Sequence, residues 1–327
     1  MKQRSSGTGA ACAAFVLLLA ASSAAWAQSY PTKPVRIVVP FAPGGAVDTV
    51  GRMVGQKLSE AWKQPVLVEN RPGAGGIIAA DMVAKSPPDG HTMLLATVAL
   101  AVTPSVYRRL PYDPMKDLVP VTQVTAHPLV LTANPKLSAS SLRELIAAAK
   151  SKPGSISYGS TGVGTSTQLL MEWLNIVAGI NTVHVPYKGD APQSAALLSG
   201  EVQLGLKAAI GIVSHIKNGR LRALGVTGHK RSALLPDVPT LAEAGLAGFD
   251  SGSWMGVFAP AGVPKEIVSQ FQGEMAKVIR LPDITSRLAA QGFDPIGNMP
   301  QEFAARFQAD HATYARIVKE ARIPLQQ

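Results

Sequence analysis

Short apolar runs alternate along the chain with longer stretches in which apolar residues recur every three or four positions. Residues 35–39 are mainly β-branched, which predicts a buried strand, and the apolar positions of 47–62 fall at helical spacing. A second strand is expected at 65–68, a helix at 75–85 and a third strand at 93–96. This β-α-β-α-β order predicts a parallel sheet with helical crossovers.

The same alternation runs through the rest of the chain. Strands are expected at 128–132, 156–158, 183–185, 202–206, 221–226 and 254–259, and helices from 141 onward and at 165–177, 191–198, 210–217, 265–279, 284–291 and 301–320. Ser141 with Glu144 three residues later forms a capping box. The sequence is therefore typical of an α/β protein.

The length and composition of this α/β chain predict two folded domains. A chain of 327 residues predicts two domains, and 46% hydrophobic residues suffice for packed cores, which excludes disorder as the main state. No low-complexity linker separates two halves, so we expect the chain to cross between two lobes more than once, near 124–128 and 226–228. The expected lobes are 28–126 with 228–327, and 127–227.

The first 27 residues form an export signal by their pattern. Lys2 and Arg4 precede an apolar run centred on 15–20, and Ala25-Trp26-Ala27 matches a signal-peptidase site, so we expect cleavage after Ala27. An uncleaved membrane anchor is disfavoured because the strongly apolar run is shorter than the roughly 20 residues of a span. Cleavage there removes 27 residues, Lys2 and Arg4 among them. It leaves 300 residues and lowers the net charge from +10 to +8. We expect a periplasmic monomer without cysteine.

Several kinds of chemistry lack their usual motifs. The basic residues are scattered and no aromatic residues are interleaved with them, so we expect no nucleic-acid binding. The six histidines show no metal-ligand spacing, and we expect no metal and no cofactor. The sequence 158–162 resembles a nucleophile elbow but lacks its first glycine, and no nucleophile–base pair is evident.

Glycines gather instead where strands lead into helices. The stretches are 40–48, 70–76, 158–166 and 186–190, two in each expected lobe. Helix N-termini carry free N–H groups and partial positive charge, and glycine removes the Cβ that would block a ligand. Ligands of open α/β sheets bind at the carboxyl ends of strands, where these loops lie. Each loop alone is explained by a tight turn; the four together predict an anion-binding cleft.

Four side chains near these loops have two interpretations each. Asp48 caps a helix or holds a water or ligand amine, and capping is favoured. Lys188 pairs with an anion or is a solvated loop charge, with neither favoured. Tyr187 is interpreted as a cleft wall rather than a core residue. Lys207 is a solvated charge or a second cation for the ligand, and the solvated interpretation is slightly favoured.

Seven segments carry a resemblance to one family. They are Tyr30 to Asp48 with its Pro40-Phe41-x-x-Gly44-Gly45 run, Val68 to Gly76, Pro88 to Thr92, Tyr158 to Ser160, Pro186 to Gly189, Pro236 to Gly245 and Ala259 to Pro264. In this order, over nearly all of the chain after residue 27, they resemble the Bug-type, TctC-like periplasmic receptors of tripartite tricarboxylate transporters.

The resemblance implies a fold, a function and a site. The implied fold is a type II periplasmic binding protein, two doubly wound α/β lobes joined by a hinge. The implied function is capture of a small carboxylate, aromatic ones included, and delivery to the transporter's membrane subunits. The ligand-binding residues expected from loops and resemblance together are Phe41, Ala42, Gly44, Gly45, Asp48, Gly73, Ala74, Gly75, Gly76, Thr97, Ser160, Thr161, Gly164, Thr165, Ser166, Tyr187, Lys188 and Lys207.

The chain departs from the family pattern at three positions. Gln168 stands where many relatives have histidine, Gln203 where many have aspartate, and Lys207 where amino-acid-binding relatives often have an acidic residue. These departures favour a mono- or dicarboxylate over an amino acid. A periplasmic enzyme and a receptor that feeds a sensor stay as alternatives, and the lack of a nucleophile–base pair disfavours the enzyme.

Overall fold

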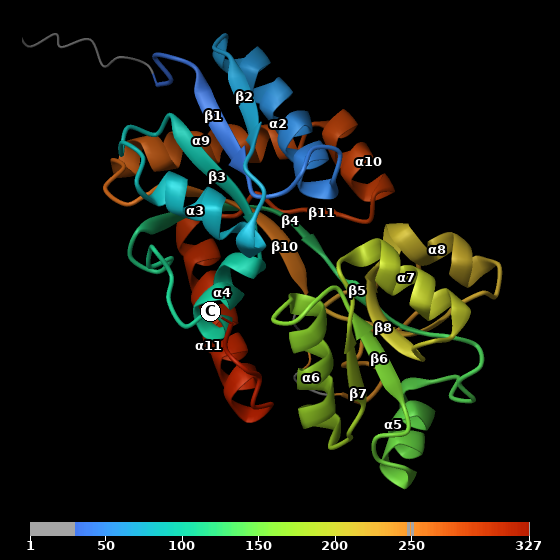
Figure 1. Cartoon of the computed structure of the whole chain (residues 1–327). Coiled ribbons are helices and arrows are strands. Elements are labelled where there is room, and N and C mark those ends of the chain that lie inside the picture. The colour runs from blue at the N-terminus through green and yellow to red at the C-terminus, as the bar shows by residue number, and fades with distance from the viewer. Residues whose placement is uncertain (1–29, 247–248, 250–251, 327) are drawn as a thin grey trace, which may run out of the picture.

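The computed structural model describes residues 30–246, 249 and 252–326, so the expected signal peptide and its cleavage site lie outside the described residues. Figure 1 shows two bodies, one built from the blue and cyan start and the orange and red end of the chain, the other from its green and yellow middle. Each body holds one sheet with helices packed on it, so the fold is the mixed α/β arrangement of two lobes that the sequence predicts.

The first sheet has six strands in the order β11-β4-β10-β3-β1-β2. Its elements are β1 (Val35–Val39), α2 (Ala46–Trp62), β2 (Val66–Asn70), a 3₁₀ turn η1 (Ala74–Gly76), α3 (Ile77–Ala84), β3 (Thr92–Thr97), α4 (Ala99–Val106), β4 (Leu118–His127), β10 (Ser253–Pro260), α9 (Lys265–Ile279), α10 (Pro282–Ala290), β11 (Asp294–Pro295) and α11 (Pro300–Glu320). β1 pairs parallel with β2 and β3, as predicted, whereas β10 and β11 pair antiparallel.

The second sheet has five strands in the order β7-β6-β8-β5-β9. Its elements are β5 (Leu129–Ala133), α5 (Leu142–Ser151), β6 (Ser157–Ser160), α6 (Ser166–Ala178), β7 (Val183–Pro186), α7 (Asp190–Ser199), β8 (Leu204–Ala208), α8 (Ala209–Lys217) and β9 (Arg222–Val226). β6 is parallel to β7 and β8, and β5 is antiparallel to β8 and β9. Ser141 caps α5 by accepting from the Glu144 N–H, as the capping box predicts.

Close packing of α2 on the first sheet depends on two glycines. A Cβ on Gly51 would lie 3.2 Å from Leu95, and one on Gly55 would lie 3.4 Å from Val68. The helix therefore packs directly against β1, β2 and β3, and its N-terminus is held beside the ends of those strands. Val50, Val54 and Leu58 complete the buried face of the helix at helical spacing.

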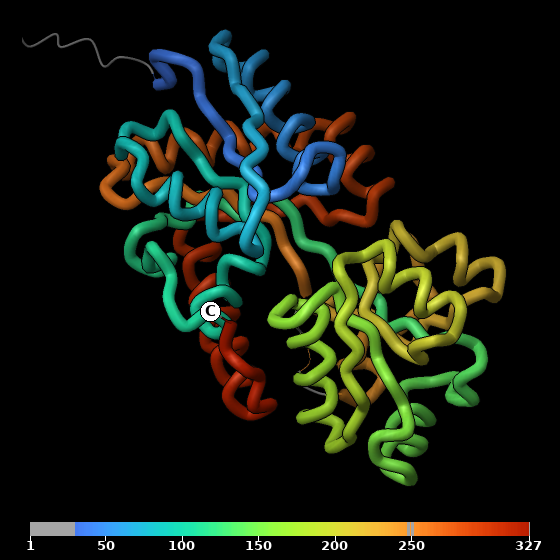
Figure 2. Tube along the Cα trace, in the orientation of Figure 1, coloured from blue at the N-terminus to red at the C-terminus, as the bar shows by residue number. Residues whose placement is uncertain are grey.

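The chain passes between the sheets at two places (Figure 2). The first is at Pro128, where β4 of one sheet leads directly into β5 of the other, inside the crossing expected at 124–128. After β9 the chain stays beside the second sheet, because the Leu241 N–H donates to the Val226 carbonyl and Val226 bridges Thr240. It enters the first sheet only at Ser253. The lobe bounds stay a proposal, and these contacts favour a second boundary near 253 rather than 228.

Candidate functional site

The predicted loops lie at the carboxyl ends of the parallel strands in both sheets. In the first sheet β1 leads into the 41–45 loop, β2 into the 71–76 loop, and β3 ends at Thr97. In the second sheet β6 leads into the 161–165 loop and β7 into the 187–189 loop. Since these strands run parallel within each sheet, each set of loops shares one edge, as predicted.

One buried carboxylate organises the first set of loops. Asp48 is 3% exposed, and its Oδ2 accepts from the Gly44 N–H at 2.9 Å and from Arg52 Nε at 3.1 Å. Its Oδ1 accepts from Asn70 Nδ2 at 2.9 Å, and Asn70 Nδ2 also donates to the Phe41 carbonyl at 3.0 Å. Asp48 lies in the first turn of α2 but caps none of its N–H groups, because its backbone donor, Gly44, precedes the helix. Its carboxylate is occupied by the protein itself.

The two adjacent glycines of this loop differ. The Gly44 N–H already donates to Asp48. The φ of Gly44 is +85°, a backbone conformation that is strained for any residue with a side chain. Gly45 is the N-cap of α2, with φ −78°, and no side chain caps the helix there. Both glycines are exposed. The first-turn N–H groups that follow Gly45 are therefore better placed for a ligand than the Gly44 N–H.

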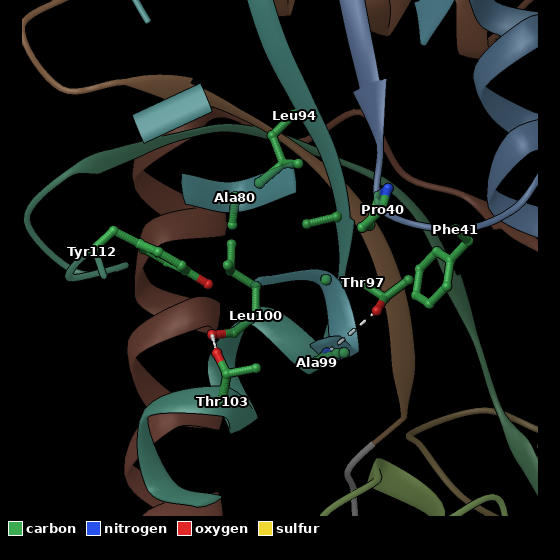
Figure 3. A pocket seen from close by; sticks show the side chains of 12 residues that line it. Pro40, Phe41, Ala80, Leu94, Thr97, Ala99, Leu100, Thr103 and Tyr112 are labelled. Carbon is green, nitrogen blue, oxygen red and sulfur yellow. Dashed lines mark hydrogen bonds between the residues drawn. The ribbon is translucent and has the colours of Figure 1, made fainter. Parts of the chain in front are cut away.

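The second loop packs against the first and leaves little room behind it. A Cβ on Gly76 would lie 3.2 Å from Pro40 Cβ. Phe41, Gly75, Gly76 and Thr97 line one side of a small cavity that reaches back to Tyr112 (Figure 3). Its volume of about 10 Å³ holds at most one water. The cavity is therefore too small to hold a solute molecule and is part of the wall that these loops form.

In the second sheet a chain of hydrogen bonds fixes the 160–164 loop. The Gly164 N–H donates to Gln168 Oε1 at 2.6 Å, which turns the Gln168 amide nitrogen toward His184 Nδ1 at 3.2 Å. Nδ1 must then accept, so the proton lies on Nε2, which donates to Ser160 Oγ at 2.6 Å. The Ser160 hydroxyl donates onward to the Gly162 carbonyl at 3.0 Å. Sequence reasoning missed His184, because only the β6–β7 pairing brings it to Ser160.

This geometry corrects the expectation that no nucleophile–base pair exists. Ser160 and His184 are such a pair by distance, but Ser160 is fully buried and its Oγ also accepts from the Gly162 N–H at 3.1 Å. A histidine that donates through Nε2 has no lone pair there to take the serine proton. The pair therefore holds the loop in shape and does not activate the hydroxyl.

The hydroxyls of the same loop are also committed to the loop. Thr165 is the N-cap of α6, yet its Oγ1 donates to the Gly162 carbonyl at 2.7 Å and caps no helical N–H. The Thr161 N–H donates to Thr167 Oγ1 at 3.1 Å. Ser166 opens the helix and is half-buried. As at Gly45, the first-turn N–H groups of the helix have no side-chain cap.

Lys207 is neither solvated nor free for a ligand, so the interpretation as a solvated charge is wrong. It is 2% exposed, and its Nζ donates to Asp190 Oδ1 at 2.5 Å and to Gln193 Oε1 at 3.2 Å. Burial lowers the pKa of Lys207, and the Asp190 carboxylate opposes that shift. The ion pair fixes the N-terminus of α7 beside the 187–189 loop.

The two neighbouring residues of that loop differ in exposure. Tyr187 is half-buried and its hydroxyl donates to Glu201 Oε1 at 2.8 Å, so burial and the carboxylate raise the pKa of Tyr187 to about 12. Lys188 is exposed, and within the described chain it makes no ion pair. Lys188 is thus the lysine of this loop that remains accessible to an anion.

Gln203, one of the departures from the family pattern, lies away from the loops. It precedes β8, and its Oε1 accepts from the Ser157 N–H at 2.7 Å and from Ser157 Oγ at 2.8 Å. Ser157 begins β6, so this contact is at the amino ends of the strands, opposite the glycine loops. Gln203 therefore lies outside the candidate site.

The end of the chain connects the two sets of loops. The Gln326 N–H donates to the Val106 carbonyl at 2.7 Å, which joins it to the end of α4 in the first lobe. Its Nε2 donates to the Val163 carbonyl of the second lobe at 2.6 Å. Tyr107, bridged to Gln326, places its hydroxyl 3.5 Å from where a Cβ on Gly75 would lie. The 73–76 loop of the first lobe and the 161–165 loop of the second therefore both lie next to the bridged pair Tyr107 and Gln326.

The part of the chain that the structure describes has neither a metal-ligand cluster nor a membrane-spanning helix. No group of three or more histidine, cysteine or acidic side chains there could hold a metal ion. None of the helices so described combines the length and apolarity needed to span a bilayer.

The receptor family of the tripartite tricarboxylate transporters matches residues 50–323 of this chain. The chain belongs to this family. Protein BugT of Bordetella pertussis is 36% identical over 90% of this chain and 91% of its own length. A solved structure of Rpa4515 from R. palustris with adipate has a TM-score of 0.78 at 34% identity, covering 91% of this chain and 100% of that one. MatC from Rhodopseudomonas palustris, with bound malate, has a TM-score of 0.74 at 31% identity, covering 88% and 100%.

These TctC-type receptors are periplasmic solute-binding proteins, and their family and fold are those of receptors rather than enzymes. The resemblance found in the sequence is thus confirmed. The residues that bind the solute in this chain stay a prediction.

The Asp48 network predicts a specific acid dependence. Hydrogen bonding to Arg52, together with Gly44, Asn70 and the Arg52 charge, lowers the pKa of Asp48 from 3.8 to about 2 against the effect of burial. The stabilisation is therefore complete above pH 3.8 and is lost as the pH falls through about 2. Asp48→Asn should cost about 1–3 kcal/mol at pH 7 and flatten the decline between pH 4 and 2. Urea unfolding at several pH values measures the loss of stability at pH 7 and its decline at low pH, with the exposed Glu266→Gln as control. If the stability of Asp48→Asn fell with pH in parallel with that of wild type, the network would be contradicted.

The hydrogen-bond chain predicts the tautomer of His184. Long-range proton–nitrogen NMR should find the proton on Nε2, with Nδ1 unprotonated at neutral pH. Burial lowers the pKa of His184, so the ring should stay neutral to a pH below its ordinary value of 6.5. Replacement of Gln168 by leucine should remove the preference for this tautomer. A proton found on Nδ1 in the wild type would mean that the chain runs the other way.

Proposed function

We propose that the chain captures a small carboxylate between the two sets of glycine loops and delivers it to the membrane subunits of a tripartite tricarboxylate transporter. The observation that carries the proposal is the placement of four uncapped helix N-termini, those of α2, α3, α6 and α7, directly after these loops. Their N–H groups and partial positive charge favour an anion without requiring many cations.

The charges of the site support an anion as well. Two carboxylates beside the loops, Asp48 and Asp190, are neutralised by Arg52 and Lys207 within the protein. Lys188 adds an exposed positive charge at the second set of loops. An anion between the loops would therefore meet N–H donors and the Lys188 cation, with Asp48 and Asp190 already paired.

The ligand class is inferred from the relatives. Rpa4515 was solved with adipate and MatC with malate, both dicarboxylates. Two sets of N–H donors, one in each lobe, suit a molecule with a carboxylate at each end. We propose a dicarboxylate first and a monocarboxylate second. Cleavage after Ala27, residence in the periplasm, a hinged closure and a monomeric state belong to the same proposal.

Gly45→Asp tests the site with little backbone strain, because φ at Gly45 is −78° and an added Cβ would lie 3.7 Å from its nearest neighbour, the Ala42 carbonyl. The new carboxylate repels the anion and occupies the helix N-terminus. Loss of one or two charge-assisted hydrogen bonds, about 1.5–3 kcal/mol each, should weaken binding about tenfold to several hundredfold.

The measurement is a thermal-shift screen of mono-, di- and tricarboxylates, beginning with adipate and malate, followed by calorimetric titration of the best ligand. The ligand-free melting temperature of Gly45→Asp should stay near that of wild type. Gly44→Ala is the control for backbone strain, since it should lower the melting temperature through its φ of +85° and affect binding less. Normal binding by Gly45→Asp would remove this loop from the site.

Gln326 provides a test of closure. Gln326→Ala removes the bond from its Nε2 to Val163 and keeps its backbone bonds to the first lobe. If the lobes close around the ligand, loss of one interlobe hydrogen bond of about 1 kcal/mol should weaken binding roughly fivefold, without a comparable loss of ligand-free stability. Exposed Gln301→Ala on α11 is the matched control. Unchanged affinity in Gln326→Ala would show that this contact does not favour the bound state.

A further inference from the structure

The hydrogen-bond chain behind the 160–164 loop contains one side chain that can change its charge near neutral pH. His184 is half-buried on β7, where its two ring nitrogens face different partners. Nε2 lies 2.6 Å from Ser160 Oγ, and Nδ1 lies 3.2 Å from Gln168 Nε2. Because histidine takes up a proton near neutral pH, this chain has two protonation states, and each requires its own pattern of donors and acceptors.

A backbone group fixes the orientation of the Gln168 amide in the neutral state. The Gly164 N–H can only donate, and it lies 2.6 Å from Gln168 Oε1, so the amide oxygen must point to it. The amide nitrogen then faces His184, and it too can only donate. Gln168 is 5% exposed, so its amide has little access to water that could replace either contact. The arrangement is consistent only while Nδ1 of His184 has a lone pair.

Protonation of His184 removes that lone pair. An imidazolium donates from both nitrogens, so its Nδ1–H and the Gln168 NH₂ group become two donors that face each other. The contact is satisfied again when the Gln168 amide turns over and presents Oε1 to the ring. The Gly164 N–H then faces the amide nitrogen and loses its acceptor. A proton taken up on β7 is thereby transmitted to the backbone of the glycine loop.

The ring itself is held in place in both states. Tyr158 stacks on it, with ring centroids 5.0 Å apart and an interplanar angle of 24°, and a cation on an aromatic face is favourable. The Nε2–H keeps Ser160 Oγ as its acceptor whether or not Nδ1 carries a proton. The Gln168 amide is the group that turns, because rotation about its last bond leaves the rest of the side chain in place.

The ionisable groups around the ring come from the elements packed against it and from the loop that follows β7. Burial raises the pKa of the stacked Tyr158, which keeps its hydroxyl neutral. Glu172 of α6 accepts from that hydroxyl at 2.5 Å. Past the end of β7, Lys188 is exposed and Asp190 pairs with Lys207. Within the described chain no carboxylate is hydrogen-bonded to the ring.

We propose that His184 and Gln168 form a pH-dependent switch in the wall of the candidate site. With the ring neutral, Gln168 holds the Gly164 N–H and fixes the 160–164 loop. With the ring protonated, Gln168 turns to His184 and releases the Gly164 N–H. If this loop holds the solute, the affinity for the solute would follow the same protonation; that consequence alone rests on the proposed function.

The test is a pH titration of the purified protein without ligand, which follows the His184 ring and the backbone amides by NMR. Burial lowers the pKa of His184, so the midpoint of the ring should lie below pH 6.5. The Gly164 amide should shift with the same midpoint, and its protection against hydrogen exchange should fall about fivefold or more. The Gly179 N–H, which donates to Ile176 at the far end of α6, is the internal reference and should not respond.

Gln168→Glu should uncouple the loop from the ring. A carboxylate can accept from the Gly164 N–H with one oxygen and from a protonated Nδ1 with the other. The variant should raise the His184 midpoint by about one pH unit or more and keep Gly164 protected while the ring is charged. Gln203→Glu makes the same change of charge in the same lobe, at the opposite ends of the strands, and should leave the midpoint near that of wild type.

The switch is overturned if the Gly164 amide does not respond while His184 titrates, or if the ring takes up no proton before the protein unfolds. It is also overturned if Gln168→Glu loses protection at Gly164 as wild type does, or if Gln203→Glu raises the midpoint as much as Gln168→Glu. These measurements contain no ligand. Failure of the switch therefore leaves the proposed carboxylate binding intact, and failure of carboxylate binding leaves the switch intact.

Discussion

The first wall of the candidate site depends on the demand that a buried carboxylate be neutralised. Asp48 is almost completely buried, and it reaches that state only by accepting from a backbone N–H, a guanidinium and an amide. Those partners come from the loop after β1, from α2 and from the end of β2. Their mutual arrangement is thereby fixed before any ligand arrives, because leaving any of them unpaired beside a buried charge is costly.

The second wall reaches the same rigidity without charge. Gly164, Gln168, His184 and Ser160 form a chain in which each group has one role as donor or acceptor, so the loop has a single consistent arrangement. In both walls the side chains satisfy the protein's own backbone, and the groups left for a ligand are N–H donors at helix starts. This fits a chain with only 16% charged residues that is expected to hold an anion.

The sequence predicted most of the elements, because buried strands and amphipathic helices leave strong periodic signals. It missed α4, in which Pro104 interrupts the pattern, β11, which is two residues long, and most of β4, whose Pro120 argues against a strand. The glycine loops were located from local sequence, since turn chemistry is local. The roles of His184, Lys207 and Gln326 were not, because each depends on a partner 17 or more residues away or on strand pairing.

Lys207 shows why a family pattern alone would mislead at such a position. A lysine in place of an acidic residue suggests a cation directed at the ligand, yet its ammonium is buried beneath α7 and neutralised by Asp190. The Lys207 charge can therefore influence a ligand only indirectly. It holds the 187–189 loop in position, and it neutralises the Asp190 carboxylate at that edge of the sheet. Only the lysine of this pair is buried, since the Asp190 side chain is largely exposed. Loss of Asp190 would therefore leave the buried Lys207 ammonium without its anion, which is costly. If these loops hold a carboxylate as proposed, selectivity among carboxylates would depend on how far apart the two walls hold their N–H donors, a distance that the proposed hinge would set.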